Sequence, residues 1–200
     1  MNSISHDKQL ELIRDAAKRN LKSFSISNTT MQTLSPEIAC LKNLRILRLS
    51  ENKLRKIPPE IGELKNLRRL LSLFKNRIGK LPPQIAELSN LKCMDIGGNP
   101  FGIMPPEVFE LTELTELHFG FNRAETIPSE IFRLKKLREC SLPHCQFKEF
   151  PHALLTLANL SELSLSGNHL EKLPPDIGRL GKLTALQIND NWRPLNQNLP

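Results

Sequence analysis

The feature that most constrains the fold of this chain is a spacing of 23 residues. The segment LRILRLSENKL (44–54) returns as LKCMDIGGNPF (91–101) and as LSELSLSGNHL (160–170). Each unit has one landmark position directly after its apolar run, and these positions hold Thr29, Asn52, Asn76, Asn99, Asn122, Cys145, Asn168 and Asn191. Successive landmarks are 23 residues apart, except for one interval of 24, which predicts a bulge near 68–70. Such a period indicates a chain built from stacked supersecondary units.

The pattern inside each unit predicts a short strand with one buried face. Leu47 and Leu49 are apolar on either side of Arg48, the alternation that a half-buried strand requires. Strands of successive units then stack in parallel, about 4.8 Å apart. An Asn at the landmark carries both a donor and an acceptor for the backbone groups that the turn leaves unpaired. We therefore expect a buried structural ladder made of Asn52, Asn76, Asn99, Asn122, Cys145, Asn168 and Asn191.

A second motif, rich in proline, lies between the landmarks. It reads IPPEIGEL at 57–64, LPPQIAEL at 81–88 and LPPDIGRL at 173–180. Proline fixes φ near −65° and removes a backbone donor, which prevents a regular α-helix. The motif predicts short extended or single-turn segments on the side opposite the strands.

The period and the pattern L-x-x-L-x-L-x-x-N/C-x-L resemble the leucine-rich repeat family from Leu21 to about Asn191. The proline motif is similar to that of the 23-residue, intracellular LPxxIxxL subclass, which includes Ras-suppressor-type proteins, Scribble-like scaffolds and the repeat regions of Roco GTPases. The resemblance implies an α/β horseshoe-shaped solenoid with a parallel β-sheet on its concave face and extended or 3-10 segments on its convex face. The expected domains are an N-terminal capping helix (1–20), eight repeats (21–191) and a C-terminal cap or truncated end (192–200).

The expected capping helix begins near residue 5. Leu10, Ile13 and Ala17 share one helical face, and Asp7 in the first turn complements the helix dipole. A membrane-binding or partner-binding helix is the alternative, although this apolar face is narrow for that purpose. At the other end we expect Trp192 to seal the last turn.

One cluster has the residue types of a zinc site. Cys140, His144 and Cys145 lie within the segment RECSLPHCQF, and thiolate and imidazole are preferred zinc ligands. The repeat register places both cysteines at inward positions and His144 at an outward one, so the three side chains cannot converge. We predict neither a metal site nor a cofactor.

Several functional classes are excluded by what the chain lacks. No apolar run approaches the roughly 20 residues of a transmembrane helix. The polar N-terminus lacks the apolar stretch of a signal peptide, which favours a cytoplasmic protein. Motifs for nucleotide binding, for serine hydrolases and for zinc peptidases are absent, so we predict that the chain is not an enzyme.

The register also predicts which side chains face outward on the concave surface. Glu116, Glu139 and Glu162 form one column, with Asp95 and His118 beside them. Like charges on adjacent strands repel, and a basic partner relieves that repulsion; the alternative is a solvated acidic face screened by salt. Exposed aromatic anchors add to a protein-binding surface. The predicted binding residues are Asp95, Glu116, His118, Glu139, Glu162, Phe74, Phe121, His144 and Arg48.

The net charge of +7 arises in the first half of the chain, because residues 101–200 contain slightly more acids than bases. The basic residues there act either as a solubilising rim or as a binder of anionic lipid, nucleic acid or acidic protein. Nucleic acid is disfavoured because only 5% of residues are aromatic.

The predicted function is that of a protein–protein interaction module, or scaffold, in signalling. The family resemblance implies small GTPases or scaffold components as partners. Two alternatives are the recognition domain of a larger enzyme, such as a Roco GTPase or a bacterial effector, and a charge-driven binder of anionic surfaces.

Overall fold

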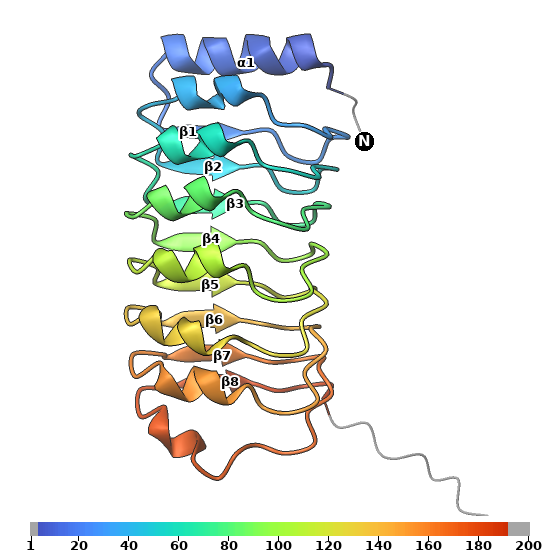
Figure 1. Ribbon diagram of the computed structural model, residues 1–200, viewed down its shortest axis with the longest axis vertical. Coiled ribbons are helices and arrows are strands. Elements are labelled where there is room, and N and C mark those ends of the chain that lie inside the picture. The colour runs from blue at the N-terminus through green and yellow to red at the C-terminus, as the bar shows by residue number, and fades with distance from the viewer. Residues whose placement is uncertain (1–3, 192–200) are drawn as a thin grey trace, which may run out of the picture.

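The computed structural model describes residues 4–191 as a stack of repeat units preceded by one α-helix, α1 (His6–Lys18) (Figure 1). Each unit contributes one three-residue strand to a single sheet. The strands are β1 (Ser23–Ser25), β2 (Ile46–Arg48), β3 (Leu70–Ser72), β4 (Cys93–Asp95), β5 (Glu116–His118), β6 (Glu139–Ser141), β7 (Glu162–Ser164) and β8 (Ala185–Gln187).

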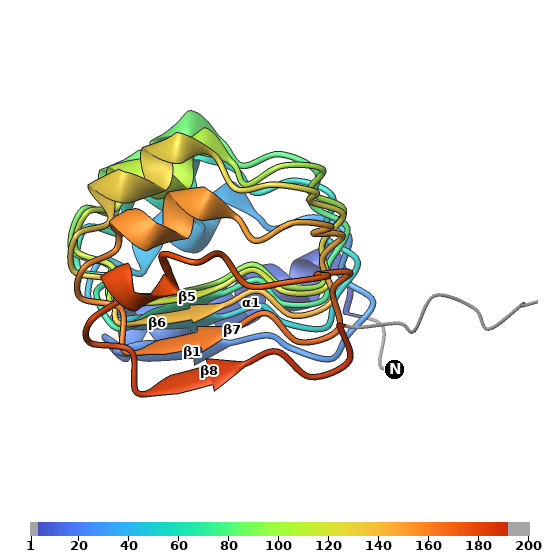
Figure 2. The same ribbon diagram turned by 90° about the horizontal axis from the view of Figure 1, so that it is seen from below.

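The sheet is parallel and open, with the eight strands in chain order from β1 to β8. Equivalent positions of neighbouring units pair with each other, so that Leu47 pairs with Leu71 and Leu117 with Cys140. The middle residue of each strand points into the core, and the first and third residues point outward. We call this outward surface the sheet face. Figure 2 shows the sheet on one side of the molecule and the short helices on the other.

The proline motifs form short 3-10 helices on the side opposite the sheet. Pro58 precedes such a helix with an extended ψ of 147°, and the N–H of Leu64 closes it by donating to the carbonyl of Ile61. The predicted α/β solenoid, with its sheet and its 3-10 segments, is confirmed. The helices are η1 (Pro36–Cys40), η2 (Pro59–Glu63), η3 (Pro83–Glu87), η4 (Pro106–Glu110), η5 (Ser129–Arg133), η6 (His152–Thr156) and η7 (Ile177–Arg179).

One continuous apolar core runs between the two layers along the stack. Each unit contributes leucine, isoleucine or phenylalanine side chains that are almost fully buried, as Leu47 and Leu49 are in the second unit. A single unit cannot enclose its own apolar face, so the stability of each unit depends on its neighbours.

Helix α1 packs against the first unit, but its buried face differs from the predicted one. Gln9, Ile13 and Ala16 are buried, whereas Leu10 is only half-buried. Of the three residues predicted to share one face, Ile13 is fully buried, and Leu10 and Ala17 are half-buried, while Gln9 makes polar contacts with the adjoining loop. The Gln9 amide donates to the carbonyl of Thr33 at 2.9 Å and accepts from the N–H of Ser35 at 2.6 Å.

The landmark asparagines connect neighbouring units through buried hydrogen bonds. Asn76 donates to the carbonyls of Leu49 and Leu73, both at 2.9 Å, and accepts from the N–H of Leu54 at 3.0 Å. One amide therefore satisfies backbone groups of its own unit and of the preceding one. The same pattern recurs at Asn99, Asn122, Asn168 and Asn191, and Asn52 bonds likewise to Thr29 and to the carbonyls of Ile26 and Leu49.

The residue before each landmark turns the chain with a positive φ. These residues are Asn28, Glu51, Lys75, Gly98, Phe121, His144, Gly167 and Asp190. For Phe121, with φ of 59°, this is an uncommon conformation that costs roughly 1–2 kcal/mol relative to an ordinary one. Two observations explain why position 167 holds glycine. Its φ is +67°, and an added Cβ would lie 2.3 Å from Nδ1 of His144.

The extra residue of the 24-residue interval lies just before β3. Leu67 is fully buried in place of the apolar residue expected at position 68, while Arg68 and Arg69 are both exposed. The N–H of Lys92 in the next unit then donates to the carbonyl of Arg68. The irregularity therefore ends before the inward residue of β3, and the sheet keeps its register.

Cys145 leaves one unit without a landmark amide. Its thiol donates to the carbonyl of Phe119 at 3.8 Å, a weak interaction. In the second unit the N–H of Leu54 donates to the amide oxygen of the next landmark, Asn76. Ala124 is the equivalent residue before Cys145, and among residues 4–191 its buried N–H has no acceptor. We expect Cys145→Asn to raise the free energy of unfolding by about 1–2 kcal/mol, because it adds one acceptor and two donors for buried backbone groups.

Chemical denaturation of both proteins measures this effect. Cys40→Asn is the matched control, since Cys40 is exposed and its replacement leaves stability nearly unchanged. A Cys145→Asn protein no more stable than the parent would mean that the sixth unit cannot accept the ladder geometry.

Candidate functional site

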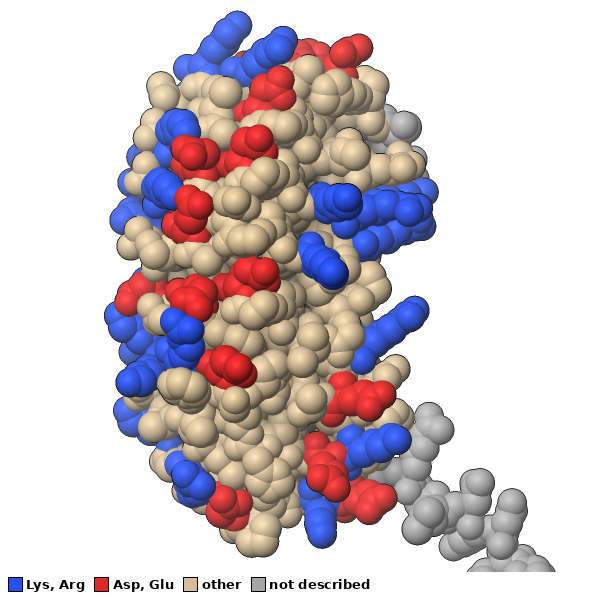
Figure 3. All heavy atoms as spheres, in the orientation of Figure 1, with Lys and Arg blue, Asp and Glu red and all other residues tan. Residues whose placement is uncertain are grey.

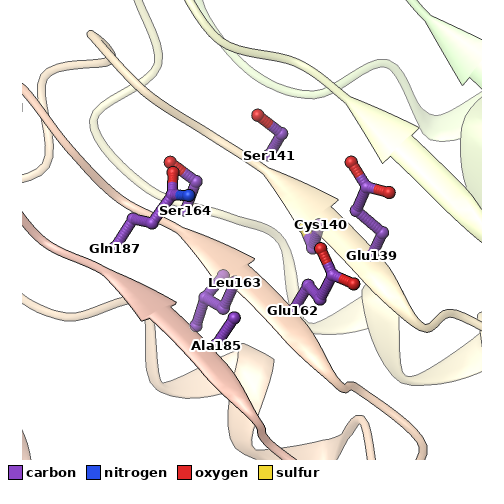
Figure 4. A pocket seen from close by; sticks show the side chains of 8 residues that line it. All are labelled: Glu139, Cys140, Ser141, Glu162, Leu163, Ser164, Ala185 and Gln187. Atoms are coloured by element: carbon purple, nitrogen blue, oxygen red, sulfur yellow. The ribbon is translucent and has the colours of Figure 1, made fainter.

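The sheet face presents a column of three glutamates on adjacent strands. Glu116 pairs in register with Glu139, and Glu139 pairs with Glu162. Glu116 and Glu162 are exposed and Glu139 is half-buried. Figure 4 shows Glu139 and Glu162 at the matching position on β6 and β7, beside the shallow hollow of about 80 Å³ that they line. We call Glu116, Glu139 and Glu162 the glutamate column.

No strong cation neutralises this column within residues 4–191. Among the described residues, neither lysine nor arginine forms an ion pair with any of the three carboxylates, and the only basic group near one is the imidazole of His118, whose Nδ1 lies 3.8 Å from Oε1 of Glu139. Parallel pairing holds the carboxylates on neighbouring strands, so their repulsion persists in the folded chain. The column is therefore a negatively charged strip on the sheet face.

Three residues of different chemistry meet beside the column. The side chains of Cys93, Glu116 and His118 bring one ligand atom each to within 4.8 Å of one another. Glu116 and His118 are among the predicted binding residues and the register aligns position 93 with 116, but only the structure shows that the three ligand atoms meet. Burial, the hydrogen bond to Glu116 and the nearby negative charges raise the pKa of the Cys93 thiol to about 12.

Asp95 lies behind this cluster on β4 and pairs in register with His118. Its carboxylate accepts hydrogen bonds from the Ser72 hydroxyl and from the N–H of Gly97, both at 3.1 Å. Burial raises the pKa of Asp95, while the Gly97 N–H and the neighbouring His118 oppose that shift. Asp95 is thus held in place by the sheet rather than left free in solvent.

The predicted aromatic residues lie where the strands end and the chain turns. Phe121 is 54% exposed and stacks on His144, with ring centroids 4.5 Å apart. Phe74 is half-buried, and the Lys75 ammonium lies 5.1 Å from its ring centre. Phe74 and Phe121 both line a hollow of about 190 Å³ that also contains Asp95 and His118. The structure therefore brings Phe74 and Phe121 together with Asp95 and His118, whereas Glu139 and Glu162 line the other hollow.

Arg48 stands apart from this surface. It is exposed at the end of β2, and two strands, β3 and β4, separate it from the first member of the glutamate column. Its expected place on the sheet face is as the register predicts, but it does not share a site with the acids.

The cluster of Cys140, His144 and Cys145 does not converge. Both thiols are buried in the core, and burial raises the pKa of Cys140 to about 12 and that of Cys145 to about 11. His144 is exposed and packs on Phe121 instead. These cysteines therefore act as small apolar core residues.

The two edges of the stack differ in charge. On the edge where the strands begin, cations and acids of adjacent units pair, as in Lys65 with Glu87 and Lys92 with Glu113 at 2.5 Å each. Figure 3 shows a cluster of basic side chains on the opposite edge, at the level of the second and third units. This edge is formed by the segments that follow the landmark residues Asn52 and Asn76. Exposed basic residues of these segments, for which the described part of the chain shows no ion pair, are Arg55, Lys56, Arg77 and Lys80.

Comparison with known proteins agrees with this geometry. The family model for the leucine-rich repeat matches residues 43–64 and 159–180, which are the second and seventh units. The fold is a leucine-rich repeat solenoid. No match was found among curated protein sequences.

Two solved structures resemble the leucine-rich repeat stack. An internalin (InlF) from Listeria monocytogenes superposes with a TM-score of 0.61 at 20% identity, over 88% of this chain and 64% of the internalin chain. A leucine-rich repeat protein from Leptospira interrogans superposes with a TM-score of 0.51 at 22% identity, over 96% of this chain and 70% of that protein. The chain thus spans less than two thirds of the internalin chain, and at these identities the likeness concerns the fold alone.

The expected C-terminal segment 192–200, with Trp192, lies outside the described residues. Within the described part, no helix has the length and apolar character needed to cross a membrane.

Proposed function

We propose that this chain is a protein-binding module that recognises a basic surface of a partner through its sheet face. The observation that carries the proposal is the in-register glutamate column, which forms no ion pair with lysine or arginine in the described chain. Leucine-rich repeat proteins generally mediate protein–protein interaction through an extended surface of this kind. The partner contributes lysine or arginine side chains to the column.

The exposed aromatic pair supplies the apolar part of the same surface. Phe121 and His144 stack just beyond the C-terminal ends of β5 and β6, and Phe121 lines the hollow that also contains Asp95 and His118. Binding energy at interfaces concentrates in such aromatic anchors, whereas charge complementarity selects the partner. The resemblance to intracellular leucine-rich repeat proteins makes cytoplasmic small GTPases or scaffold components the candidate partners.

Charge reversal of the column tests this proposal. We expect Glu116, Glu139 and Glu162 changed together to Lys to abolish the capture of proteins that the parent chain retains, because repulsion replaces attraction at the centre of the interface. Quantitative mass spectrometry of captured proteins measures the effect. The melting temperature should stay nearly unchanged, since these side chains lie outside the core.

The matched control carries the same charge change elsewhere. Glu125, Glu130 and Glu149 are exposed and lie away from the sheet, and their joint replacement by Lys should leave capture intact. Equal capture by the parent and the column variant would exclude the sheet face as the binding surface.

Two alternative functions lead to different expectations. The recognition part of an enzyme such as a Roco GTPase or a bacterial effector would use the same sheet face, and a nucleotide-binding motif elsewhere in the gene product would identify it. Charge-driven binding to anionic surfaces would use the basic edge with Arg55 and Arg77, and it would weaken steeply with added salt.

A further inference from the structure

We propose that Cys93, Glu116 and His118 form a zinc-binding site at the centre of the sheet face. Their ligand atoms, one from β4 and two from β5, all lie within 4.8 Å of one another. Zinc bonds of about 2.0–2.3 Å place the donor atoms of a tetrahedral site roughly 3.3–3.8 Å apart. Small rotations of three side chains on a fixed pair of strands close that difference.

The ligand types select the metal. A thiolate and an imidazole favour zinc over magnesium or calcium, which prefer oxygen ligands alone. Three protein ligands leave a fourth position on the solvent side for water or for a group of a bound molecule, as in zinc sites that are open. The thiolate and the Glu116 carboxylate together balance the charge of the ion.

The surroundings of the cluster support a cation. Glu139 lies 3.8 Å from Nδ1 of His118, and Asp95 pairs with His118 across the strands, so carboxylates lie next to this imidazole on both neighbouring strands. A carboxylate beside a ligating histidine orients the ring and raises its basicity. The hydrogen bonds from Ser72 and Gly97 to Asp95 hold that carboxylate in position.

The site gives a role to a thiol that the protein-binding surface does not use. Within the described residues the Cys93 thiol forms no disulfide, and its sulfur lies within 4.8 Å of a ligand atom of Glu116 and of His118. A divalent cation reverses the electrostatics of the same cluster and stabilises the thiolate. Zinc would also neutralise the first member of the glutamate column.

Titration of the full chain with Co²⁺ and then Zn²⁺ tests the proposal without any partner protein. We expect Co²⁺ to give the intense visible bands of tetrahedral coordination and a near-ultraviolet thiolate-to-cobalt band, and Zn²⁺ to abolish both by displacement. Cys93→Ser and His118→Gln should each weaken Zn²⁺ binding by roughly 10- to 100-fold or more, as measured by calorimetry. The thiolate band should disappear in Cys93→Ser.

The controls are a cysteine and a histidine outside the cluster. Cys40→Ser and His169→Gln change exposed residues of the same types and should bind both metals as the parent does. Circular dichroism of every variant verifies the fold. Unchanged affinity in Cys93→Ser, or a parent spectrum without tetrahedral and thiolate bands, would overturn the site, and either result would leave the protein-binding proposal untouched.

Discussion

Replacing Phe119 by Ala is expected to lower the free energy of unfolding by about 3–5 kcal/mol, the usual loss for a buried phenylalanine. Phe119 follows β5 in the middle of the stack and is fully buried. Its ring lies 6.1 Å from that of Phe101, at an interplanar angle of 27°. The cavity would open where the fourth and fifth units meet, so neither unit could relax without disturbing the next.

Urea denaturation followed by circular dichroism measures this loss. Phe132→Ala is the matched control, because Phe132 on η5 is 50% exposed and its removal leaves no cavity. Similar losses in the two variants would show that the core around Phe119 is not closely packed.

Asn122→Ala is expected to destabilise the chain by about 1–3 kcal/mol, since it leaves buried backbone groups unpaired. The Asn122 amide donates to the carbonyls of Phe119 at 2.6 Å and Ile96 at 3.2 Å, and it accepts from the N–H of Phe101 at 3.3 Å. The alanine methyl group can satisfy none of these groups, and water has no access to them. The same denaturation experiment reports the change.

Asn66→Ala is the control for this prediction. Asn66 also connects two units, by donating to the carbonyl of Lys42 at 2.8 Å, but that bond is exposed and water replaces it. If both variants lost the same small amount, the ladder would not depend on burial.

The repeat architecture was predictable because its signal is local and recurs in every unit. An apolar residue on either side of an outward one specifies the strand, and a polar landmark specifies the turn, as Leu47, Leu49 and Asn52 illustrate. The same register predicted that Glu116, Glu139 and Glu162 form one column, because parallel strands one repeat apart must pair at equivalent positions.

The capping helix was less predictable because its environment is not repeated. The sequence pattern favoured Leu10 for the buried face, yet Gln9 is buried there through its bonds to Thr33 and Ser35. The two hydrogen bonds that Gln9 makes with the loop backbone favour its burial over that of Leu10. No periodic pattern contains that information, since the loop conformation arises only when helix and first unit meet.

The sequence by itself determined the repeat length, the inward and outward positions and the column of acids, because a stack of equivalent units turns spacing along the chain into position in space. Only the tertiary structure decided which neighbouring side chains meet: Cys93 with Glu116 and His118, and Phe121 with His144. Those contacts depend on the side-chain rotamers and on how each unit stacks on the next. Residues roughly one repeat apart become neighbours through strand pairing, and their chemistry arises from that contact.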